Sequence, residues 1–232
     1  AALTLAGAVA AGHHEPPVLP NFFTCNFTEY TAFNEHPPPY LNGIPQAPFK
    51  ASRGFTIYDW NATVLIEHRY DYCVDIFPDM PNDFPCTFWD VAGVSYLTST
   101  NASKLPPCCV FGDPWYPPPP NFLRSRVNAT YHGERPWDQG RATWWELPSV
   151  PPPAGPFWYT FLDGDASPQV YGSFSFPGIS GWVQQNFWGV QNTTRPTPAM
   201  MALPAECLPT ASLPNCGFFG AQRPRRLSPF FH

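Results

Sequence analysis

The chain has 232 residues, a length that fits one large or two small domains, and its hydrophobic content of 44% is enough for a buried core. Charged residues make up only 12% of the sequence while aromatic residues reach 17%, a balance that excludes a disordered polyelectrolyte. The net charge of −5 argues against affinity for nucleic-acid phosphates, so we expect no nucleic-acid partner.

The first residues are typical of an export signal. Residues 1–12 are apolar and end in small side chains, as the second half of a signal peptide does, and Ala8-Val9-Ala10 fits a cleavage site. Outside this stretch, no run of the sequence is long and apolar enough to span a bilayer. We therefore expect residues 1–12 to be a signal-peptide remnant and the protein to be secreted, without a transmembrane segment.

Residues 13–53 are rich in proline and show no periodicity, so we expect an irregular N-terminal segment there. The chain holds 33 prolines, with runs of them at residues 37–39, 117–120 and 151–153. Such runs form polyproline II and cannot lie inside a sheet. We interpret them as stiff loops rather than docking sites for proline-binding modules, because those modules are mostly intracellular.

A strand pattern begins at Gly54. Residues 54–60 lead into a turn at Asn61-Ala62, and residues 63–73 continue with a period of two. One face of this second run is predicted to be buried and consists of Ala62, Val64, Ile66, His68, Tyr70 and Tyr72. The other face is predicted to be solvated and consists of Thr63, Glu67, Arg69 and Asp71.

The clearest predicted strand covers residues 121–132. Leu123, Val127 and Tyr131 point to one face of it, while Asn128 falls on the opposite, solvent-facing side. Further strands are predicted at residues 86–91, 94–99, 141–147, 157–162 and 169–176. The pattern at residues 180–190 is ambiguous, and residues 198–203 fit one helical turn. Strands spaced this closely predict an antiparallel meander.

Five Asn-x-Ser/Thr triplets are spread along the chain, at Asn26, Asn61, Asn101, Asn128 and Asn192. A random sequence of this composition would contain roughly one or two of these triplets. The surplus predicts passage through a glycosylating secretory pathway and a surface position for each acceptor. The place of Asn128 on the solvent-facing side of its predicted strand agrees with this interpretation.

The seven cysteines are Cys25, Cys73, Cys86, Cys108, Cys109, Cys207 and Cys216. In an exported chain we expect them to form three disulfides and to leave one cysteine over. Cys108 and Cys109 point to opposite faces of an extended chain, so we expect them to bond to different partners. Cys207 or Cys216 is expected to tie the C-terminal segment to the sheet. The odd thiol is expected to pair with another chain or with a cysteine outside this sequence.

The sequence carries no familiar catalytic signature, since it lacks a Gly-x-Ser-x-Gly elbow, an HExxH motif, a P-loop and a dinucleotide fingerprint. His13-His14 is the one local cluster with metal character, and a copper enzyme built on it would need a second histidine such as His68 or His132. Two histidines in a flexible leader more often have no such role. We therefore expect a non-enzymatic protein without a metal or another cofactor.

A series of short motifs between Gly54 and Cys216 adds a family resemblance. The series consists of Gly54–Asp59, Arg69–Asp71, Gly93–Tyr96, Cys108–Cys109, Ala129–Gly133, Trp144–Trp145, Phe157–Tyr159 and Pro198–Cys207. In this order the motifs resemble those of the ependymin-related proteins, especially the divergent members from protists and algae. The proline runs, the histidine leader and the basic tail depart from the family pattern.

The resemblance implies a mainly β fold, a curved antiparallel sheet of the lipoprotein-carrier (LolA/LppX-like) half-barrel type, with one or two short helices and an apolar pocket on its concave face. The implied pocket residues are Phe55, Ile57, Val64, Ile66, Tyr70, Tyr72, Leu123, Val127, Tyr131, Phe157, Tyr159 and Phe161. Family members are linked to calcium, but no acidic loop of the EF-hand type supplies ligands here.

The resemblance also implies an ependymin-like β domain at residues 54–216, followed by a basic tail at residues 217–232. In the tail, Arg223–Arg226 fits a cleavage site of secretory processing proteases, although a solvated basic tail is the interpretation we favour.

The sequence leaves two hypotheses about function. The one-sided aromatic face of residues 157–162 fits either a dense core or a ligand cavity, and the resemblance favours the cavity. We therefore expect a secreted, N-glycosylated protein that binds a lipid or another hydrophobic ligand without catalysis. The alternative is a structural glycoprotein of a cell-surface or extracellular assembly, such as a homo-oligomer, which the proline-rich loops and the odd cysteine favour.

Overall fold

The computed structural model describes residues 15–33, 44–45, 48–75, 82–100, 105–110, 117–125, 129–137, 140–148, 156–162, 170–178 and 181–216. The helices in these ranges are short, and none of them is long and apolar enough to cross a membrane.

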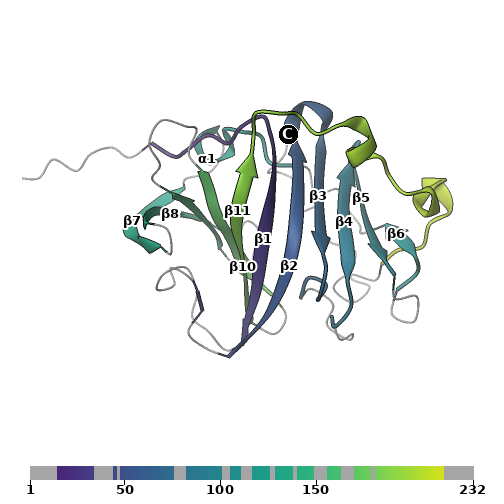
Figure 1. Ribbon diagram of the computed structural model, residues 1–232, viewed down its shortest axis with the longest axis horizontal. Helices are drawn as coiled ribbons and strands as arrows, with labels where there is room; N and C mark the ends of the chain where they lie inside the picture. The colour runs from purple at the N-terminus through teal and green to yellow at the C-terminus, as the bar shows by residue number, and fades with distance from the viewer. Residues whose placement is uncertain are drawn as a thin grey trace, which may run out of the picture.

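The described residues form one eleven-stranded antiparallel sheet with few helices, which confirms the predicted fold class (Figure 1). The strands are β1 (Phe22–Phe33), β2 (Phe49–Asp59), β3 (Val64–Arg69), β4 (Cys86–Val91), β5 (Val94–Ser99), β6 (Cys108–Val110), β7 (Thr130–Trp137), β8 (Gly140–Leu147), β9 (Phe157–Leu162), β10 (Val170–Pro177) and β11 (Gly181–Gln191). The helical elements are α1 (Phe122–Ser125) and the 3-10 helices η1 (Trp60–Ala62), η2 (Pro198–Met201), η3 (Ala205–Cys207) and η4 (Thr210–Ser212).

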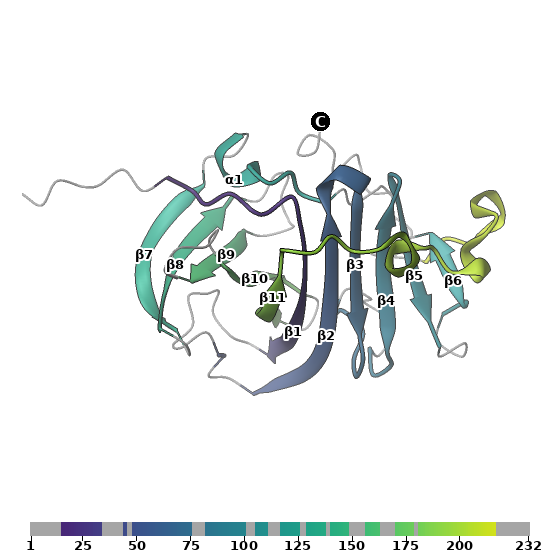
Figure 2. The same cartoon turned by 45° about the horizontal axis from the view of Figure 1, so that its top comes forward.

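The sheet is open and curved, and its strand order is β6-β5-β4-β3-β2-β1-β11-β10-β9-β8-β7. Figure 2 shows that β7 to β11 bend round into an arc, which we call the curved arm, whereas β2 to β6 lie side by side in a flatter row, which we call the flat wing. Strand β1 joins the two parts because it pairs with β11 on one side and with β2 on the other. The outline is a half-barrel with a concave and a convex face.

Contacts between distant strands show which face is concave. Phe176 of β10 packs against a hydrophobic cluster that includes Phe88 of β4 and Leu97 of β5. Phe174 packs both on the cluster of the curved arm and on the cluster of β1 and β2. Strands as far apart as β10 and β4 can meet only across the hollow side of the sheet, so these side chains line the concave face.

The C-terminal segment, residues 192–216, covers the convex face of the flat wing. The residues of this segment that pack there are Met201, Leu203, Cys207 and Leu213. Beneath them lie Ile57, Ile66 and Tyr96, which are all buried although they point away from the concave side. The flat wing therefore has an apolar layer on each of its two faces.

Two disulfides fix this segment to the edge strand β6. As predicted, Cys108 and Cys109 bond to different partners, Cys207 and Cys216, on the two faces of the sheet. Backbone hydrogen bonds add to this clamp, because the Val110 amide donates to the Pro214 carbonyl at 2.8 Å and the Cys216 amide donates to the Val110 carbonyl at 2.9 Å. A strand edge occupied in this way is less open to pairing with another chain.

A third disulfide joins Cys73, which follows β3, to Cys86 at the start of β4. The odd cysteine is Cys25, which is free and lies in the first half of β1 with 1% of its surface exposed. At that depth its thiol cannot reach a second chain without local opening of the sheet, so the expected intermolecular bond does not fit this fold.

The N-terminal segment is the largest correction to the sequence analysis. Residues 13–53, expected to be irregular, contain β1 and the first residues of β2, and β1 lies at the centre of the sheet. The positions of β1 that face the concave side are Phe23, Cys25, Phe27, Glu29 and Thr31. Because Glu29 and Thr31 occupy buried positions, the strand lacks the apolar alternation by which it could have been predicted.

The strand predicted at residues 121–132 is also corrected. Residues 122–125 form helix α1, and β7 begins only at Thr130. The backbone turns here because the Phe122 amide donates to the Pro119 carbonyl at 2.9 Å and the Arg124 amide donates to the Asn121 carbonyl at 2.8 Å. Val127 and Asn128 lie outside the described residues.

Other strands match the prediction closely. The predicted strands at residues 86–91, 94–99 and 157–162 are confirmed residue for residue as β4, β5 and β9. The ambiguous stretch at residues 180–190 is strand β11, and the helical turn predicted at residues 198–203 is η2. Residues 1–14 and 217–232, which carry the expected signal remnant and basic tail, are outside the described ranges.

Candidate ligand-binding site

The concave face of the curved arm is built from aromatic side chains. Its cluster contains Leu19, Phe122, Leu123, Trp145, Leu147, Tyr159 and Phe161, with Tyr131, Phe157 and Phe174 packed against it. The ring of Tyr159 lies between that of Phe122, at 4.9 Å between centroids, and that of Phe174, at 5.0 Å. Helix α1 supplies Phe122 and Leu123, so this helix covers one end of the arm.

The aromatic lining continues across β1 and β2. Phe23 stacks on Tyr58 at 4.8 Å, and Phe27 meets Phe187 edge-on at 6.1 Å. The Tyr58 hydroxyl donates to the Pro118 carbonyl at 2.6 Å, and this bond joins the central strands to the segment that leads into α1. Burial and the nearby carboxylate of Asp59 raise the pKa of Tyr58, so the hydroxyl remains a donor at physiological pH.

A polar group interrupts this lining at its centre. We call Glu29 of β1, Glu67 and Arg69 of β3 and Gln185 of β11 the Arg69 cluster. Arg69 Nε donates to Glu29 Oε2 at 2.9 Å, and Arg69 Nη2 donates to Glu67 Oε2 at 3.0 Å. Gln185 Nε2 lies 3.2 Å from Glu29 Oε2 and 3.3 Å from Glu67 Oε1, so it bridges the two carboxylates.

Three members of the Arg69 cluster are deeply buried, since Glu29 and Gln185 are at most 2% exposed and Arg69 is 3% exposed, whereas Glu67 is partly exposed. Burial raises the pKa of Glu29, and the guanidinium of Arg69 offsets part of that rise. Burial alone would lower the pKa of Arg69, but Glu29 and Glu67 raise it overall, so the guanidinium stays charged. The guanidinium also lies over the Phe27 ring, 5.6 Å from its centroid, which is a cation–π arrangement.

Two atoms of the Arg69 cluster lack a hydrogen bond. Arg69 Nη1 and Gln185 Oε1 are buried, and neither has a hydrogen-bond partner among the described residues. A buried polar atom left without a partner costs about 1–3 kcal/mol. The cluster therefore offers one donor and one acceptor on the concave side.

A second polar group, Asp90 of β4, lies on the same face within the flat wing. Its side chain is fully buried, and neither carboxyl oxygen has a hydrogen-bond partner in the described part of the chain. Burial raises the pKa of Asp90 to about 8. The group is thus mainly a neutral carboxylic acid at pH 7.

The structure divides the sequence-predicted pocket residues between the two faces. Residues on the concave face are Leu123, Tyr131, Phe157, Tyr159 and Phe161, and they lie together in the curved arm. Residues on the convex face are Phe55, Ile57, Val64 and Ile66, and they lie under the C-terminal segment. The reason is that both faces of the flat wing are apolar, so alternation alone could not identify the concave one.

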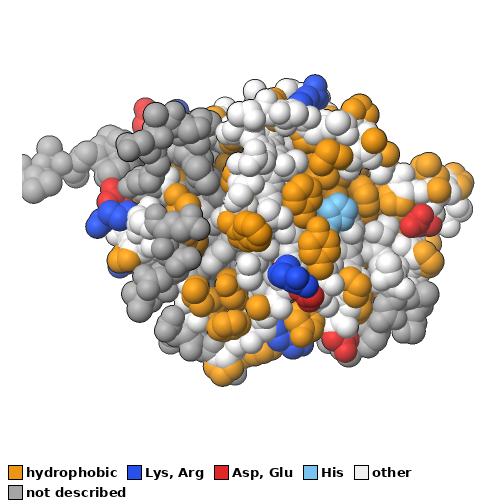
Figure 3. Space-filling view, in the orientation of Figure 1, with side chains coloured by type: hydrophobic (Ala, Val, Ile, Leu, Met, Phe, Trp, Pro, Cys, Tyr) orange, Lys and Arg blue, Asp and Glu red, His pale blue; other side chains and the backbone are white. Residues whose placement is uncertain are grey.

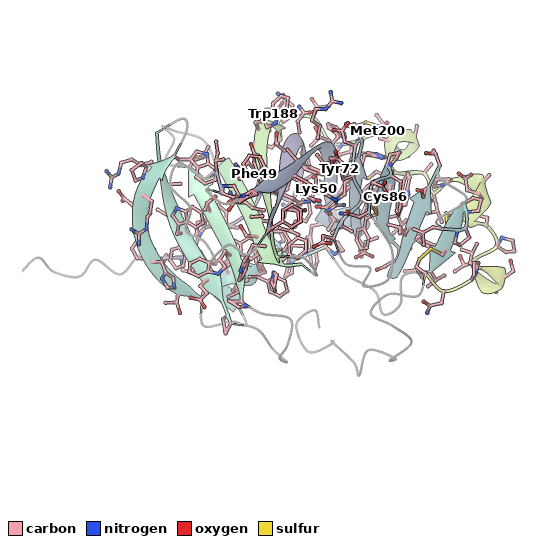
Figure 4. All side chains as sticks on the ribbon, turned by 90° about the horizontal axis from the view of Figure 1, so that it is seen from below. Phe49, Lys50, Tyr72, Cys86, Trp188 and Met200 are labelled. Atoms are coloured by element: carbon pink, nitrogen blue, oxygen red, sulfur yellow. A yellow bond between two sulfur atoms is a disulfide. The ribbon has the colours of Figure 1, made fainter. Side chains whose placement is uncertain are left out.

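The remaining predicted pocket residues line neither cluster. Tyr70 is 54% exposed, and Tyr72 is half-buried beside Lys50, whose ammonium lies 5.5 Å from the ring centroid. Figure 4 shows Tyr72 and Lys50 near one another at the end of the strands. Val127 falls outside the described residues.

Sequence reasoning missed the Arg69 cluster. Glu67 and Arg69 were assigned to a solvated face, but Arg69 is buried because the half-barrel closes over the middle strands. One signal was available: Glu29 is the single charged residue within Phe22–Phe33, and an isolated carboxylate in an otherwise uncharged strand needs a partner.

Three of the five glycosylation acceptors are described. Asn61 is exposed in η1, and Asn26 in β1 and Asn192 after β11 are partly exposed. Asn101 and Asn128 lie outside the described ranges, so the surface position expected for Asn128 is not tested.

The metal hypothesis gains no support from the arrangement of the side chains. No group of three or more His, Cys, Asp or Glu side chains suited to a metal ion occurs among the described residues, which do not include His13 and His14. His68 lies on the convex face of the inner strand β3, where Nδ1 is 3.0 Å from Thr87 Oγ1, while His132 belongs to the edge strand β7, seven strands away in the sheet order.

No family model and no curated protein matches this chain, so the ependymin resemblance remains a hypothesis. Its structure is similar to that of an uncharacterized conserved protein from Thermus thermophilus, with a TM-score of 0.47, 9% identity and coverage of 81% of this chain and 88% of that one. It is also similar to lipoprotein LppX from Mycobacterium tuberculosis, with a TM-score of 0.36, 10% identity and coverage of 74% of this chain and 88% of that one.

A third similar structure is LprF from Mycobacterium bovis, with a TM-score of 0.36, 13% identity and coverage of 76% of this chain and 90% of that one. Identities this low and TM-scores below 0.5 cannot carry a function from one protein to another. The function has to be argued from the half-barrel and its concave face.

Proposed function

We propose that this protein binds a lipid or another apolar ligand on the concave face of its half-barrel and that it does so without catalysis. The observation that carries the proposal is the Arg69 cluster, a buried donor and a buried acceptor without partners at the centre of an aromatic lining. A ligand with an apolar body and a small polar head matches both parts of this face.

The apolar part of the ligand would replace contacts among the aromatic rings of the curved arm. Phe174 is the most suitable point of entry, because it is only partly buried and touches two clusters. Removal of apolar surface from water contributes about 25 cal/mol per Å². A chain of lipid size therefore supplies enough free energy to displace partly buried rings.

The charges of the Arg69 cluster favour a neutral head group. The cluster has two carboxylates and one guanidinium, so an added anion meets more negative than positive charge. A hydroxyl group can accept from Arg69 Nη1 and donate to Gln185 Oε1 at the same time. We therefore expect a long-chain alcohol or an acylglycerol to bind better than an ionised fatty acid.

Three disulfides and five glycosylation acceptors support the proposal that the protein acts outside the cytosol. Disulfides form and persist in oxidising compartments, and Asn-x-Ser/Thr acceptors are used on the secretory route. A ligand carrier in the extracellular space would fit both features.

The test has two stages. Native mass spectrometry of the full chain, purified from a secreting host without detergent, should show a bound lipid. A pyrene-labelled long-chain alcohol should then bind the delipidated protein about tenfold more tightly than the matching carboxylate at pH 7.4, which corresponds to about 1.4 kcal/mol.

Variants separate the two parts of the proposal. Gln185→Leu removes the acceptor and should abolish the preference for the alcohol, while Trp188→Ala on the convex face should leave both affinities unchanged. Binding of neither probe would overturn the proposed function. Equal binding of both probes to the wild-type protein would overturn the role of the Arg69 cluster only.

A structural role in an assembly is the second candidate, and exposed aromatic side chains on the convex side favour it. Trp188 is 51% exposed and Phe49 is 43% exposed. Sedimentation of the glycosylated protein under non-reducing conditions distinguishes the two functions. A stable oligomer that binds neither probe would favour assembly over ligand binding.

A further inference from the structure

The convex face near β1 carries large apolar side chains in contact with solvent. Figure 3 shows hydrophobic side chains scattered over this face, with few charges among them. Figure 4 shows Trp188 on the outer side of the sheet, the side on which Met200 of the C-terminal segment also lies. Trp188 is 51% exposed, which is a large apolar surface for one side chain to leave in water.

The strand register places an acceptor asparagine beside this tryptophan. Asn26 of β1 pairs with Trp188 of β11 on one side and with Phe55 of β2 on the other. Side chains that are directly opposite in an antiparallel pair have Cβ atoms about 4.5–5.5 Å apart. Phe55 in turn stacks on His68, with 6.4 Å between ring centroids, so Asn26 lies within a row of rings.

The triplet Asn26-Phe27-Thr28 is arranged so that a modification would point outward. Phe27 is fully buried on the concave side, whereas Asn26 and Thr28 alternate with it and face the convex side. Gly189, with φ of +65°, leaves room next to the acceptor: a Cβ added there would lie 3.3 Å from Asn26 Nδ2. Asn26 is partly exposed.

We infer that Asn26 carries an N-linked glycan and that its first N-acetylglucosamine packs on the indole of Trp188, so that the sugar covers this part of the convex face. The transfer forms a bond between Asn26 Nδ2 and the anomeric carbon of the sugar. The lipid diphosphate of the oligosaccharide donor leaves, and the proton lost from the amide nitrogen passes to solvent. The C–H groups on one face of the sugar ring provide the apolar surface that meets the indole.

Asn61 serves as the internal comparison. It is exposed in η1, between β2 and β3, and it has no register partner because it lies outside the strands. A glycan at Asn61 is expected to extend into solvent. The same sugar should therefore stabilise the fold at Asn26 and have little effect at Asn61.

The test uses the full chain secreted from a glycosylating host and a matched pair of variants. Thr28→Ser keeps the acceptor triplet and Thr28→Ala destroys it, while both keep Asn26 and Phe27. Peptide mass spectrometry should find Asn26 modified in Thr28→Ser and unmodified in Thr28→Ala. Calorimetry should show a melting temperature about 2–4 °C lower for the unmodified protein, the shift expected for one aromatic contact in a chain of this size.

The contact with Trp188 is tested by repeating the pair in a Trp188→Ala background, where the difference between the two variants should vanish. Hydroxyl-radical footprinting gives a measurement that needs no change at Trp188. Oxidation of Trp188 should rise severalfold in Thr28→Ala, whereas oxidation of Trp60 should not change. An unmodified Asn26 in Thr28→Ser, an equal temperature difference in both backgrounds or equal oxidation of Trp188 would overturn the inference.

Discussion

The flat wing and the curved arm stabilise the same sheet by different means. All three disulfides lie in the flat wing or join it to the C-terminal segment. Residues 129–191, which include the curved arm, contain no cysteine. Aromatic side chains pack on both faces of the arm: Tyr159 and Phe161 lie on the concave side, and a cluster that contains Trp137, Trp144 and Trp158 lies on the convex side.

This difference indicates which part of the half-barrel can move. A disulfide restricts the chain even when the packing around it is lost, whereas ring contacts can separate and re-form. The disulfide-bonded flat wing is therefore the part we expect to be rigid, and the curved arm is the part we expect to open.

The largest effect is expected from joint removal of the Cys108–Cys207 and Cys109–Cys216 disulfides, which join residues 99 and 107 positions apart, because either bridge alone still ties the C-terminal segment to β6. Replacing all four cysteines by alanine should lower the free energy of unfolding by at least about 5 kcal/mol, because the unfolded chain regains the entropy of a long loop. Guanidinium denaturation measures the change, and hydrogen exchange should locate the loss of protection in β5, β6 and the C-terminal segment.

Cys25→Ala is the matched control for that variant. It removes one buried sulfur from β1 without opening a covalent loop, so it should cost less than about 2 kcal/mol. If the variant without these two disulfides were no less stable than Cys25→Ala, the disulfides would not be what holds the flat wing together.

Phe161→Ala tests the curved arm. Phe161 is 1% exposed, and its truncation should cost about 3–5 kcal/mol through the cavity that remains. Because the arm has no covalent bridge, exchange of the β8 and β9 amides should accelerate while that of β4 and β5 stays slow.

Leu97→Ala makes the corresponding cavity in the flat wing, where Leu97 is fully buried. It should cost about 2–5 kcal/mol, yet exchange in β4 and β5 should still be slowed by the disulfides. Equal loss of protection across the whole sheet in both variants would show that the two parts unfold as one unit.

The buried side chain of Asp90 should make the stability of the flat wing depend on pH. Its pKa is raised to about 8 in the folded protein, above the ordinary value for a carboxyl group, so the folded state holds the proton more tightly than the unfolded state. The resulting stability is fully present below about pH 4 and is lost as the pH rises through 8. Asp90→Asn removes this dependence, so its free energy of unfolding should stay nearly constant from about pH 5 to pH 9, a range over which that of the wild-type protein should fall by several kcal/mol. Denaturation of both proteins at several pH values measures the difference, and parallel curves would contradict it.

The flat wing was easier to predict from the sequence than the strand at the centre of the sheet. Strands β4 and β5 have strong apolar and aromatic content and a tight turn at Ala92-Gly93, so their bounds could be read from local signals alone. Strand β1 carries Asn, Thr and Glu residues whose burial is decided by β2 and β11, strands that pair with it from distant parts of the chain. The residue pattern within β1 alone therefore does not show which of its side chains are buried.

The candidate site was less predictable than the fold for a related reason. Alternation assigned Val64 and Ile66 to one face of β3 and Glu67 and Arg69 to the other, which is the correct division. It could not say that the apolar face would be covered by the C-terminal segment and that the charged face would be buried in the concavity. The Arg69 cluster depends on three strands, and its members come together only when the half-barrel closes.

The smallest predicted effect concerns the hydrogen bond that links the flat wing to the segment over the curved arm. The Tyr58 hydroxyl of β2 donates to the Pro118 carbonyl, which belongs to the segment that leads into α1 over the curved arm. Tyr58→Phe deletes that bond and keeps the ring stacked on Phe23, so it should cost about 1 kcal/mol. Tyr96→Phe removes another tyrosine hydroxyl bond, 3.0 Å to Thr210 Oγ1, which lies between the flat wing and its covering segment. If the curved arm opens independently, Tyr58→Phe should accelerate exchange in α1 and in the first residues of β9, and Tyr96→Phe should not. Equal exchange in the two variants would mean that this hydroxyl does not hold the arm closed.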